Sequence, residues 1–317
     1  MEKTSMMTYE EFKGKMINSI KEYLPAKYSE FDIFVVSIQK INQKLDGLRI
    51  KIPGAKTCPT IYINDFYRED VDKKEIDNIV LKIKRIYQGR CKENPVGEEV
   101  KNYLDFDWVS ERIFYTLINH SMNEEMLQNV PYLPFYDLAI VFRCVFHIGQ
   151  NGIASSVVSE DDMKRWGVDT KLLYQLAAKN TPRLFPPVMD KITRYLKVHA
   201  NVPDSLLEDF PQDDDKLYVL SNSFGINGAA ALLYEGLLAD CADLVGEDIY
   251  VLPSSIHETI FAGVSIVDDP ELLTEIVQEA NDKVISQSDI LSYNAYRYSR
   301  KAKRLMMIRS EQETVPV

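Results

Sequence analysis

The segment Leu138–His147 constrains the fold of this chain more than any other part of the sequence. Its residues are almost all apolar or aromatic, a composition that is typical of strands buried on both faces. We therefore expect a strand here, in the centre of a sheet. The turn dipeptide Asn151-Gly152 follows it and predicts that the chain reverses into another strand at Ile153–Val158.

Residues 1–92 predict a small α+β unit. Thr8-Tyr9-Glu10-Glu11 fits a capping box, and an apolar stripe at helical spacing follows, so a helix begins here. The turn signals Asp46-Gly47 and Pro53-Gly54 separate strand-like runs. The strands are predicted at Ile33–Ile38, Leu48–Ile52 and Thr60–Ile63, and a second helix at Lys74–Tyr87. The polar loop at 89–97 is the expected boundary of this unit.

Residues 98–309 predict a larger α+β unit, and residues 310–317 a flexible tail. A helix at Thr170–Lys179 should stop before Pro182, because proline disfavours helical geometry in the preceding residue. The alanine run Ala229–Leu233 predicts a strand, although it could instead begin a helix at Gly228. The other predicted strands are Arg112–Asn119, Leu217–Leu220, Ile249–Leu252, Ala295–Ser299 and Leu305–Ile308, and the other helices are Gly236–Val245 and Pro270–Val284. The predicted fold is α+β, with mixed, largely antiparallel sheets and flanking helices.

Charge and cysteine usage exclude some classes of function. The net charge of −11, from 37 basic and 48 acidic residues, argues against general binding to nucleic acid or to an anionic membrane. No signal segment is expected at the start, and no apolar run approaches the roughly 18 residues that span a bilayer. The cysteines have no regular spacing, so we expect reduced thiols and a cytoplasmic location; they are Cys58, Cys91, Cys144 and Cys241.

Motifs for cofactors and metals are absent from the sequence. There is no glycine-rich dinucleotide motif, no Walker loop and no nucleophile elbow. His257-Glu258 begins like a zinc protease motif, but the second ligand position is Phe261. We therefore expect no cofactor and no metal site.

The segment Leu252-Pro253-Ser254-Ser255-Ile256-His257-Glu258 is the strongest candidate site. It ends a predicted buried strand with Ser254, Ser255, His257 and Glu258, whose hydroxyl, imidazole and carboxylate groups suit ligand binding or acid–base catalysis. A structural role competes with this interpretation, because polar residues at a strand end often satisfy backbone groups.

Other polar loops are candidates for ligand binding. Asp65 follows a predicted strand and could face a ligand, although Asn64-Asp65 is also typical of a turn or a helix cap. A glycine-containing loop holds Ser221, Asn222 and Asn227 and could cradle an anion, or merely connect two strands. If that loop lies beside the serine–histidine segment, the two would form one polar site.

The chain resembles an uncharacterised domain family of anaerobic gut bacteria. The segments that carry the resemblance are Leu138–Phe142, Trp166–Val168, Ala178–Leu184, Leu217–Asn222 and Leu252–Glu258, with Asp46–Leu48, Pro59–Asp65 and Tyr296–Tyr298 also fitting. The resemblance implies a cytoplasmic bacterial protein of one α+β architecture, encoded near mobile elements. It implies no reaction and no catalytic residues.

Three hypotheses for function follow. The first is an interaction or regulatory protein of a bacterial accessory or mobile-element system, with an unidentified protein partner, for which a large exposed apolar patch would be diagnostic. The second is an enzyme or small-molecule binder that uses the Ser/His/Glu residues, for which a concave pocket at His257 would be diagnostic. The third is an acidic mimic of nucleic acid that inhibits a DNA-acting partner.

Overall fold

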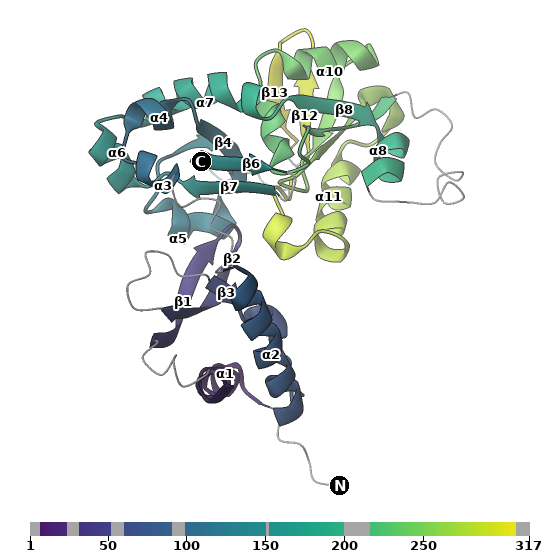
Figure 1. Ribbon diagram of the computed structural model, residues 1–317. Coiled ribbons are helices and arrows are strands. Elements are labelled where there is room, and N and C mark those ends of the chain that lie inside the picture. The colour runs from purple at the N-terminus through teal and green to yellow at the C-terminus, as the bar shows by residue number, and fades with distance from the viewer. Residues whose placement is uncertain are drawn as a thin grey trace, which may run out of the picture. The chain divides into compact units, whose positions relative to one another are not determined.

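The computed structural model describes residues 7–23, 32–51, 60–90, 99–149, 152–199 and 216–308 (Figure 1). The chain divides into two compact units, Met1–Gly97 and Glu98–Val317, and each is described by itself. Several predictions lie outside the described residues: the turn Pro53-Gly54, the loop beyond residue 90, the thiols of Cys58 and Cys91, and the tail at 310–317.

The smaller unit packs two helices on a three-stranded antiparallel sheet with the order β1-β2-β3. The apolar faces of α1 and α2 pack against buried residues of the sheet, such as Leu48 and Ile61, and form one core. The capping box forms, with Thr8 and Glu11 bonded to each other's amides. The elements are α1 (Tyr9–Tyr23), β1 (Asp32–Lys40), β2 (Gln43–Lys51), β3 (Thr60–Tyr62), the 3-10 helix η2 (Asn64–Phe66) and α2 (Lys73–Arg90).

The predicted turn at Asp46-Gly47 is wrong, because both residues lie inside β2. The chain reverses instead before Gln43, where Asn42 takes the left-handed conformation with φ 59°. Gly47 has another role: a Cβ at this position would overlap the side chain of Thr60 on the neighbouring strand. The glycine therefore permits close side-chain packing across the sheet rather than a turn.

The first sheet of the larger unit is built around β6 (Leu138–Gly149). β6 pairs along one edge with β4 (Ile113–Asn119), and along the other with β5 (Tyr132–Phe135) and β7 (Gly152–Val157). Residues 138–142 of β6 are all buried, so the prediction of a central strand is confirmed. A β-bulge between Val145 and His147 shifts the register with β7.

The second sheet of the larger unit has six strands in the order β13-β12-β10-β11-β9-β8, and all its pairs are antiparallel. The predicted C-terminal strands are present, with β13 at the edge and β12 next to it. Strands β8 and β11, like β5 above, were not predicted. The bounds are β8 (Pro187–Lys191), β9 (Leu217–Asn222), β10 (Ile249–Leu252), β11 (Thr259–Gly263), β12 (Tyr296–Ser299) and β13 (Arg304–Met307).

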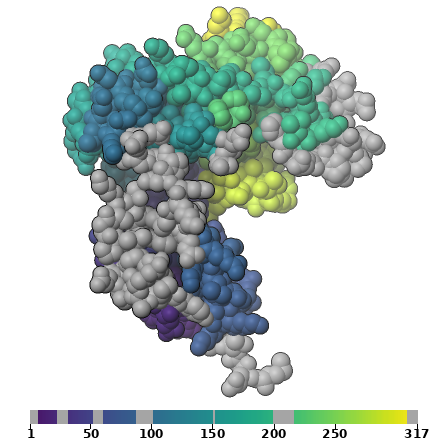
Figure 2. Space-filling view, viewed as in Figure 1, coloured from purple at the N-terminus to yellow at the C-terminus, as the bar shows by residue number. Residues whose placement is uncertain are grey.

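Helices surround these sheets, and the fold is α+β as predicted. The turn between β12 and β13 lies beside α10 (Figures 1 and 2), where Arg300 donates to Asp243 and to the Gly246 carbonyl. The helices are α3 (Glu99–Asn102), α4 (Phe106–Ser110), η3 (Ser121–Asn123), α5 (Glu124–Leu127), α6 (Glu160–Trp166), α7 (Thr170–Leu184), α8 (Ile192–His199), η5 (Gly228–Leu233), α10 (Leu237–Val245), η6 (Val264–Ile266), α11 (Glu271–Lys283) and η7 (Gln287–Asp289).

Helix α7 continues past the predicted stop at Pro182. Tertiary contacts hold its last turns: Asn180 donates to the carbonyls of Ser110 and Ile113, and the Thr181 hydroxyl accepts from the Tyr115 amide. These buried bonds anchor the helix against β4 and outweigh the local preference for a break before proline.

The predicted strand Ala229–Leu233 is also wrong, and the alternative of a helix from Gly228 holds in part, since the segment forms the 3-10 helix η5, which ends before α10 begins. Its alanines are buried in the main core, and the amide of Ala229 donates to the carbonyl of Ile256. Small side chains let this backbone approach its neighbours closely, and that packing decides the conformation of the segment.

Candidate functional site

Sheet pairing brings the predicted polar loops of the larger unit together. Strand β11 lies between β10 and β9, and Thr259 pairs with Leu220. The serine–histidine segment, which connects β10 to β11, therefore meets the loop that leaves β9. Of the predicted site residues, only Asp65 belongs to the smaller unit.

Two serine hydroxyls at this junction form hydrogen bonds with backbone groups. The Ser221 hydroxyl donates to the His257 carbonyl at 2.7 Å, and the His257 amide donates to the Ser255 hydroxyl at 3.0 Å. A Cβ on Gly228 would overlap both the Ser221 hydroxyl and the His257 carbonyl. Only glycine fits between them without displacement, so the junction is closely packed.

The imidazole of His257 is held by a hydrogen bond to Nδ1 and faces a carboxylate with Nε2. Nδ1 accepts from the backbone amide of Asn227 at 3.3 Å, and Asn227 is in the left-handed conformation with φ 54°. This bond places the proton of the neutral ring on Nε2, which lies 3.6 Å from Oδ1 of Asp289. Asp289 was not predicted; it reaches the junction because its carbonyl accepts from the amide of Ile256.

The other predicted residues bond to separate partners. Asn222 closes its own loop, since its side chain accepts from the Phe224 amide and donates to the Ile226 carbonyl. Glu258 accepts from Tyr195 of α8, and burial together with this carboxylate raises the pKa of Tyr195 to about 12. The Ser254 hydroxyl makes no hydrogen bond to the described residues, and the side chain is half-buried.

These contacts define what the junction can do chemically. The hydroxyls of Ser221 and Ser255 bond to backbone groups of His257 and not to its ring, so these two serines are not arranged as activated nucleophiles. The side chains of His257 and Asp289 are 31% and 35% exposed and lie 3.6 Å apart, which is an ion-pair distance and longer than a hydrogen bond. The junction joins three loops: the segment between β10 and β11, the loop that leaves β9, and the segment around Asp289.

Asp65 is exposed in the 3-10 turn that follows β3. Its neighbour Asn64 accepts from the Asp46 amide at 2.7 Å, which fastens the turn to β2. Asp65 lines a cavity of about 310 Å³ together with Arg68 and Glu75, and those two side chains form an ion pair with each other.

A second polar cluster, which the sequence analysis missed, joins the two sheets of the larger unit. The carboxylate of Asp137 accepts from the hydroxyls of Ser292 and Tyr296 and from the side-chain amide of Asn294. Nearby, Asn119 donates to the Leu291 carbonyl at 2.9 Å. Burial and the adjacent carboxylate of Asp137 raise the pKa of Tyr296.

Other features of the described residues bear on possible ligands. The part of the chain that the structure describes has no cluster of three or more His, Cys, Asp or Glu side chains suited to hold a metal ion. Among those same residues, no helix combines the length and the apolar composition that crossing a membrane requires. Burial raises the pKa of the Cys144 and Cys241 thiols to about 12, so both are poor nucleophiles.

The chain belongs to a family of unknown function. Residues 9–300 match the family of unknown function DUF5688, which spans both units. Comparison with the curated proteins and with the solved structures found no match.

Proposed function

We propose that this chain is an interaction protein that binds a partner helix through an exposed apolar row on α11. Leu272 and Ile276 are 49% and 54% exposed, and Val284 at the end of the helix is 79% exposed. With Ala280 they repeat every four residues, so they form one row along the helix. This row is the observation that carries the proposal.

The row lies beside the face that α11 uses for folding. Leu273 and Val277 are buried against Tyr250, Leu252 and Ala295. Since successive residues are about 100° apart around a helix, the exposed row directly adjoins the buried one. A helix that only had to cover its own sheet would carry polar residues there. In Figure 2 this segment forms part of the surface of the larger unit.

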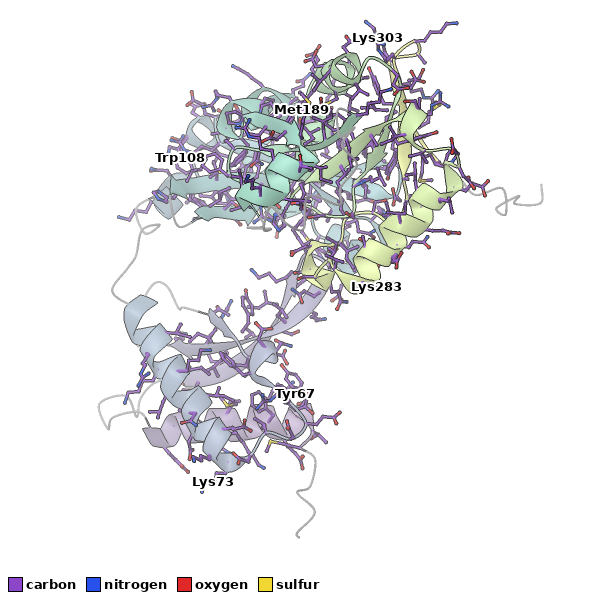
Figure 3. All side chains as sticks on the ribbon, turned by 90° about the vertical axis from the view of Figure 1, so that its right-hand side faces the viewer. Tyr67, Lys73, Trp108, Met189, Lys283 and Lys303 are labelled. Carbon is purple, nitrogen blue, oxygen red and sulfur yellow. The ribbon has the colours of Figure 1, made fainter. Side chains whose placement is uncertain are left out.

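Charge around the row indicates the chemistry of the partner. Glu275 and Glu279 are exposed on the same helix, and Lys283 is paired with Glu279 at its end (labelled in Figure 3). Further acids precede the row at Asp268, Asp269 and Glu271. The complementary partner is an amphipathic helix with an apolar face and a rim of lysine or arginine.

The chemistry of the junction favours this role over catalysis. Ser221, Ser255 and Asn227 are bonded to the backbone or ring of the same junction, which leaves no activated nucleophile to support an enzymatic proposal. We place the protein in the cytoplasm, a proposal that the buried free thiols of Cys144 and Cys241 support. Its assignment to a bacterial accessory or mobile-element system rests on the family resemblance.

Photo-crosslinking in the native host tests the proposal. A benzoylphenylalanine at position 276 keeps an apolar ring in the row, and the same residue at the exposed position 244 of α10 is the matched control. We expect position 276 to crosslink a segment of another protein that has apolar residues at helical spacing and adjacent lysine or arginine. A synthetic peptide of that segment should bind the whole chain.

Substitutions then measure the contribution of the row. Leu272→Ser with Ile276→Ser should weaken binding of that peptide by at least about tenfold, because two apolar contacts are lost. Leu244→Ser, at a residue that is 52% exposed, should leave the affinity unchanged. The proposal would be refuted if position 276 crosslinked only to copies of this chain, or only to segments without basic residues. It would also be refuted if the yield of crosslinks at position 276 did not exceed the yield at position 244.

A further inference from the structure

A small cavity lies in the larger unit, away from both α11 and the His257 junction. Its volume is about 200 Å³, and the residues that line it include Glu111, Arg112, His147, Ile148 and Arg183. They come from the turn between α4 and β4, from β6 at and beyond its bulge, and from the last turn of α7. A cavity below the roughly 300 Å³ of drug-sized sites suits a small ligand.

Arg112 is fixed in place at this cavity. Its guanidinium carbon lies 4.1 Å from the ring centroid of Trp108 (labelled in Figure 3), and its Nη1 donates to the Trp108 carbonyl at 3.0 Å. Its own carbonyl accepts from the Val145 amide, next to the bulge. The stacked guanidinium is thus pre-organised, with its remaining N–H groups available.

Arg183 is tied to the same corner of the fold. Its Nη2 donates to the Glu111 carbonyl at 2.6 Å and to the Asn180 side chain at 3.4 Å. Its Nε and Nη1 groups make no hydrogen bond to the described residues. Glu111 lines the cavity too, but it bonds to Arg183 through its backbone and not through its carboxylate.

A third arginine, Arg143, lies on the same strand as part of the lining but does not line the cavity itself. Arg143 on β6 is two residues from Val145, which also lines the cavity, and it donates to Ser155 through Nε at 3.1 Å. Burial lowers the pKa of this guanidinium.

None of these three guanidinium groups forms an ion pair within the described ranges. Of the other arginines of this unit, Arg165, Arg297 and Arg300 pair with Asp162, Asp248 and Asp243, whereas the exposed Arg304 forms no ion pair with the described residues. Arg112 is partly buried and Arg183 is exposed, so both guanidinium groups can offer N–H donors to an anion in the cavity that they line. The β-bulge at this point is a device that often shapes binding sites.

We propose that this cavity binds a phosphate group, either free or as the head of a small phosphomonoester, with Arg112 and Arg183 as the main donors. Planar guanidinium groups match phosphate oxygens with paired N–H bonds. His147 lines the same space and adds a further polar contact. The site is independent of the interaction surface on α11.

Calorimetric titration of the whole chain with inorganic phosphate, and separately with glycerol 3-phosphate, tests the proposal at constant ionic strength. We expect saturable binding of at least one of them, and the comparison shows whether the free or the esterified group is preferred. Arg183→Ala should weaken binding by about tenfold, as loss of one charged donor implies. Arg183→Lys should recover only part of the affinity, because lysine keeps the positive charge but lacks the planar pair of N–H donors of the guanidinium.

Two further variants separate a site from general electrostatic attraction. Glu111→Gln removes a negative charge from the lining and should strengthen binding by about threefold. Arg194→Ala removes an exposed arginine of α8 that is paired with Asp190 of β8. This change should leave the affinity for phosphate unchanged. Thermal unfolding checks that each variant folds. Absence of saturable binding, or equal affinity in the Arg183 and Arg194 variants, would overturn the proposal.

Discussion

The hydroxyl of Tyr296 donates to the carboxylate of Asp137, and this bond links the two sheets of the larger unit. Asp137 follows the Tyr136 turn between β5 and β6, whereas Tyr296 begins β12. The same carboxylate collects donors from Ser292 and Asn294, so one acidic side chain organises the contact between the sheets.

Removal of this acceptor should destabilise the larger unit. Asp137→Ala leaves the Ser292 and Tyr296 hydroxyls without their acceptor, and we expect a loss of about 2–4 kcal/mol in the free energy of unfolding. Tyr296→Phe should lose about 1 kcal/mol. Urea unfolding measures both, with Tyr298→Phe on the same strand as the control, since no hydrogen bond of its hydroxyl is present among the described residues. An equal effect of the two tyrosine variants would contradict this role of Asp137.

Gly228→Ala should lower stability by about 1–3 kcal/mol, because the added methyl overlaps Ser221 and the His257 carbonyl. Gly14, within helix α1, has open space around it. Gly14→Ala should therefore stabilise the smaller unit by about 0.5–1 kcal/mol. Opposite signs in thermal unfolding are the expected result, and a neutral Gly228→Ala would show that the junction is loosely packed.

His257→Ala should cost about 1–2 kcal/mol, because it leaves the Asn227 amide without its acceptor. His257→Asn keeps an acceptor near the position of Nδ1 and should recover part of the loss. Denaturant unfolding of both variants distinguishes a structural histidine from a catalytic one. If the alanine variant kept full stability, the structural account of the junction would fail.

Phe142→Ala on β6 should cost about 3–5 kcal/mol, since this fully buried ring belongs to the main core. Val157→Ala on the neighbouring β7 is the control, because Val157 is only partly buried, and its cost should stay below about 1.5 kcal/mol. Equilibrium unfolding followed by circular dichroism measures the two losses. Similar values for both would mean that β6 is not the central element of the core.

The larger unit should lose stability in alkali. Burial is the first cause that raises the pKa of Tyr115, Tyr234 and Tyr296. In the unfolded chain these phenols ionise near pH 10, while in the native state they keep their protons. The contribution of these tyrosines to the free energy of unfolding should thus be constant below about pH 10 and fall above it. Absorbance at 295 nm should show a late class of tyrosines that titrates together with unfolding, and titration of all tyrosines in the native state would refute this.

Local patterns predicted the elements whose amphipathicity or burial is strong. The apolar run of β6, the capping box of α1 and the Gly246 stop of α10 each depend on neighbours in the sequence, and each is present. The predictions of secondary structure were wrong where contacts with residues remote in sequence decide the conformation. Asn180 and Thr181 carry α7 through Pro182, and packing against Ile256 turns the alanine run into η5.

The candidate site was predictable to a similar degree. Strand order brought Ser221, Asn227 and His257 together, as the hypothesis of a shared site requires. Asp289 and Asp137 could not be found, because each acts through partners that are remote in sequence and neither lies in a recognisable motif.

The link between Asp137 and Tyr296 also bears on synthesis of the chain. A ribosome delivers β4 to β7 well before β12, so the apolar face of β6 emerges while the strands of the second sheet that help to bury it are still untranslated. Until Tyr296 leaves the exit tunnel, that face is a binding site for chaperones and a source of aggregation. Production in a heterologous host should therefore respond to translation speed and to chaperone supply.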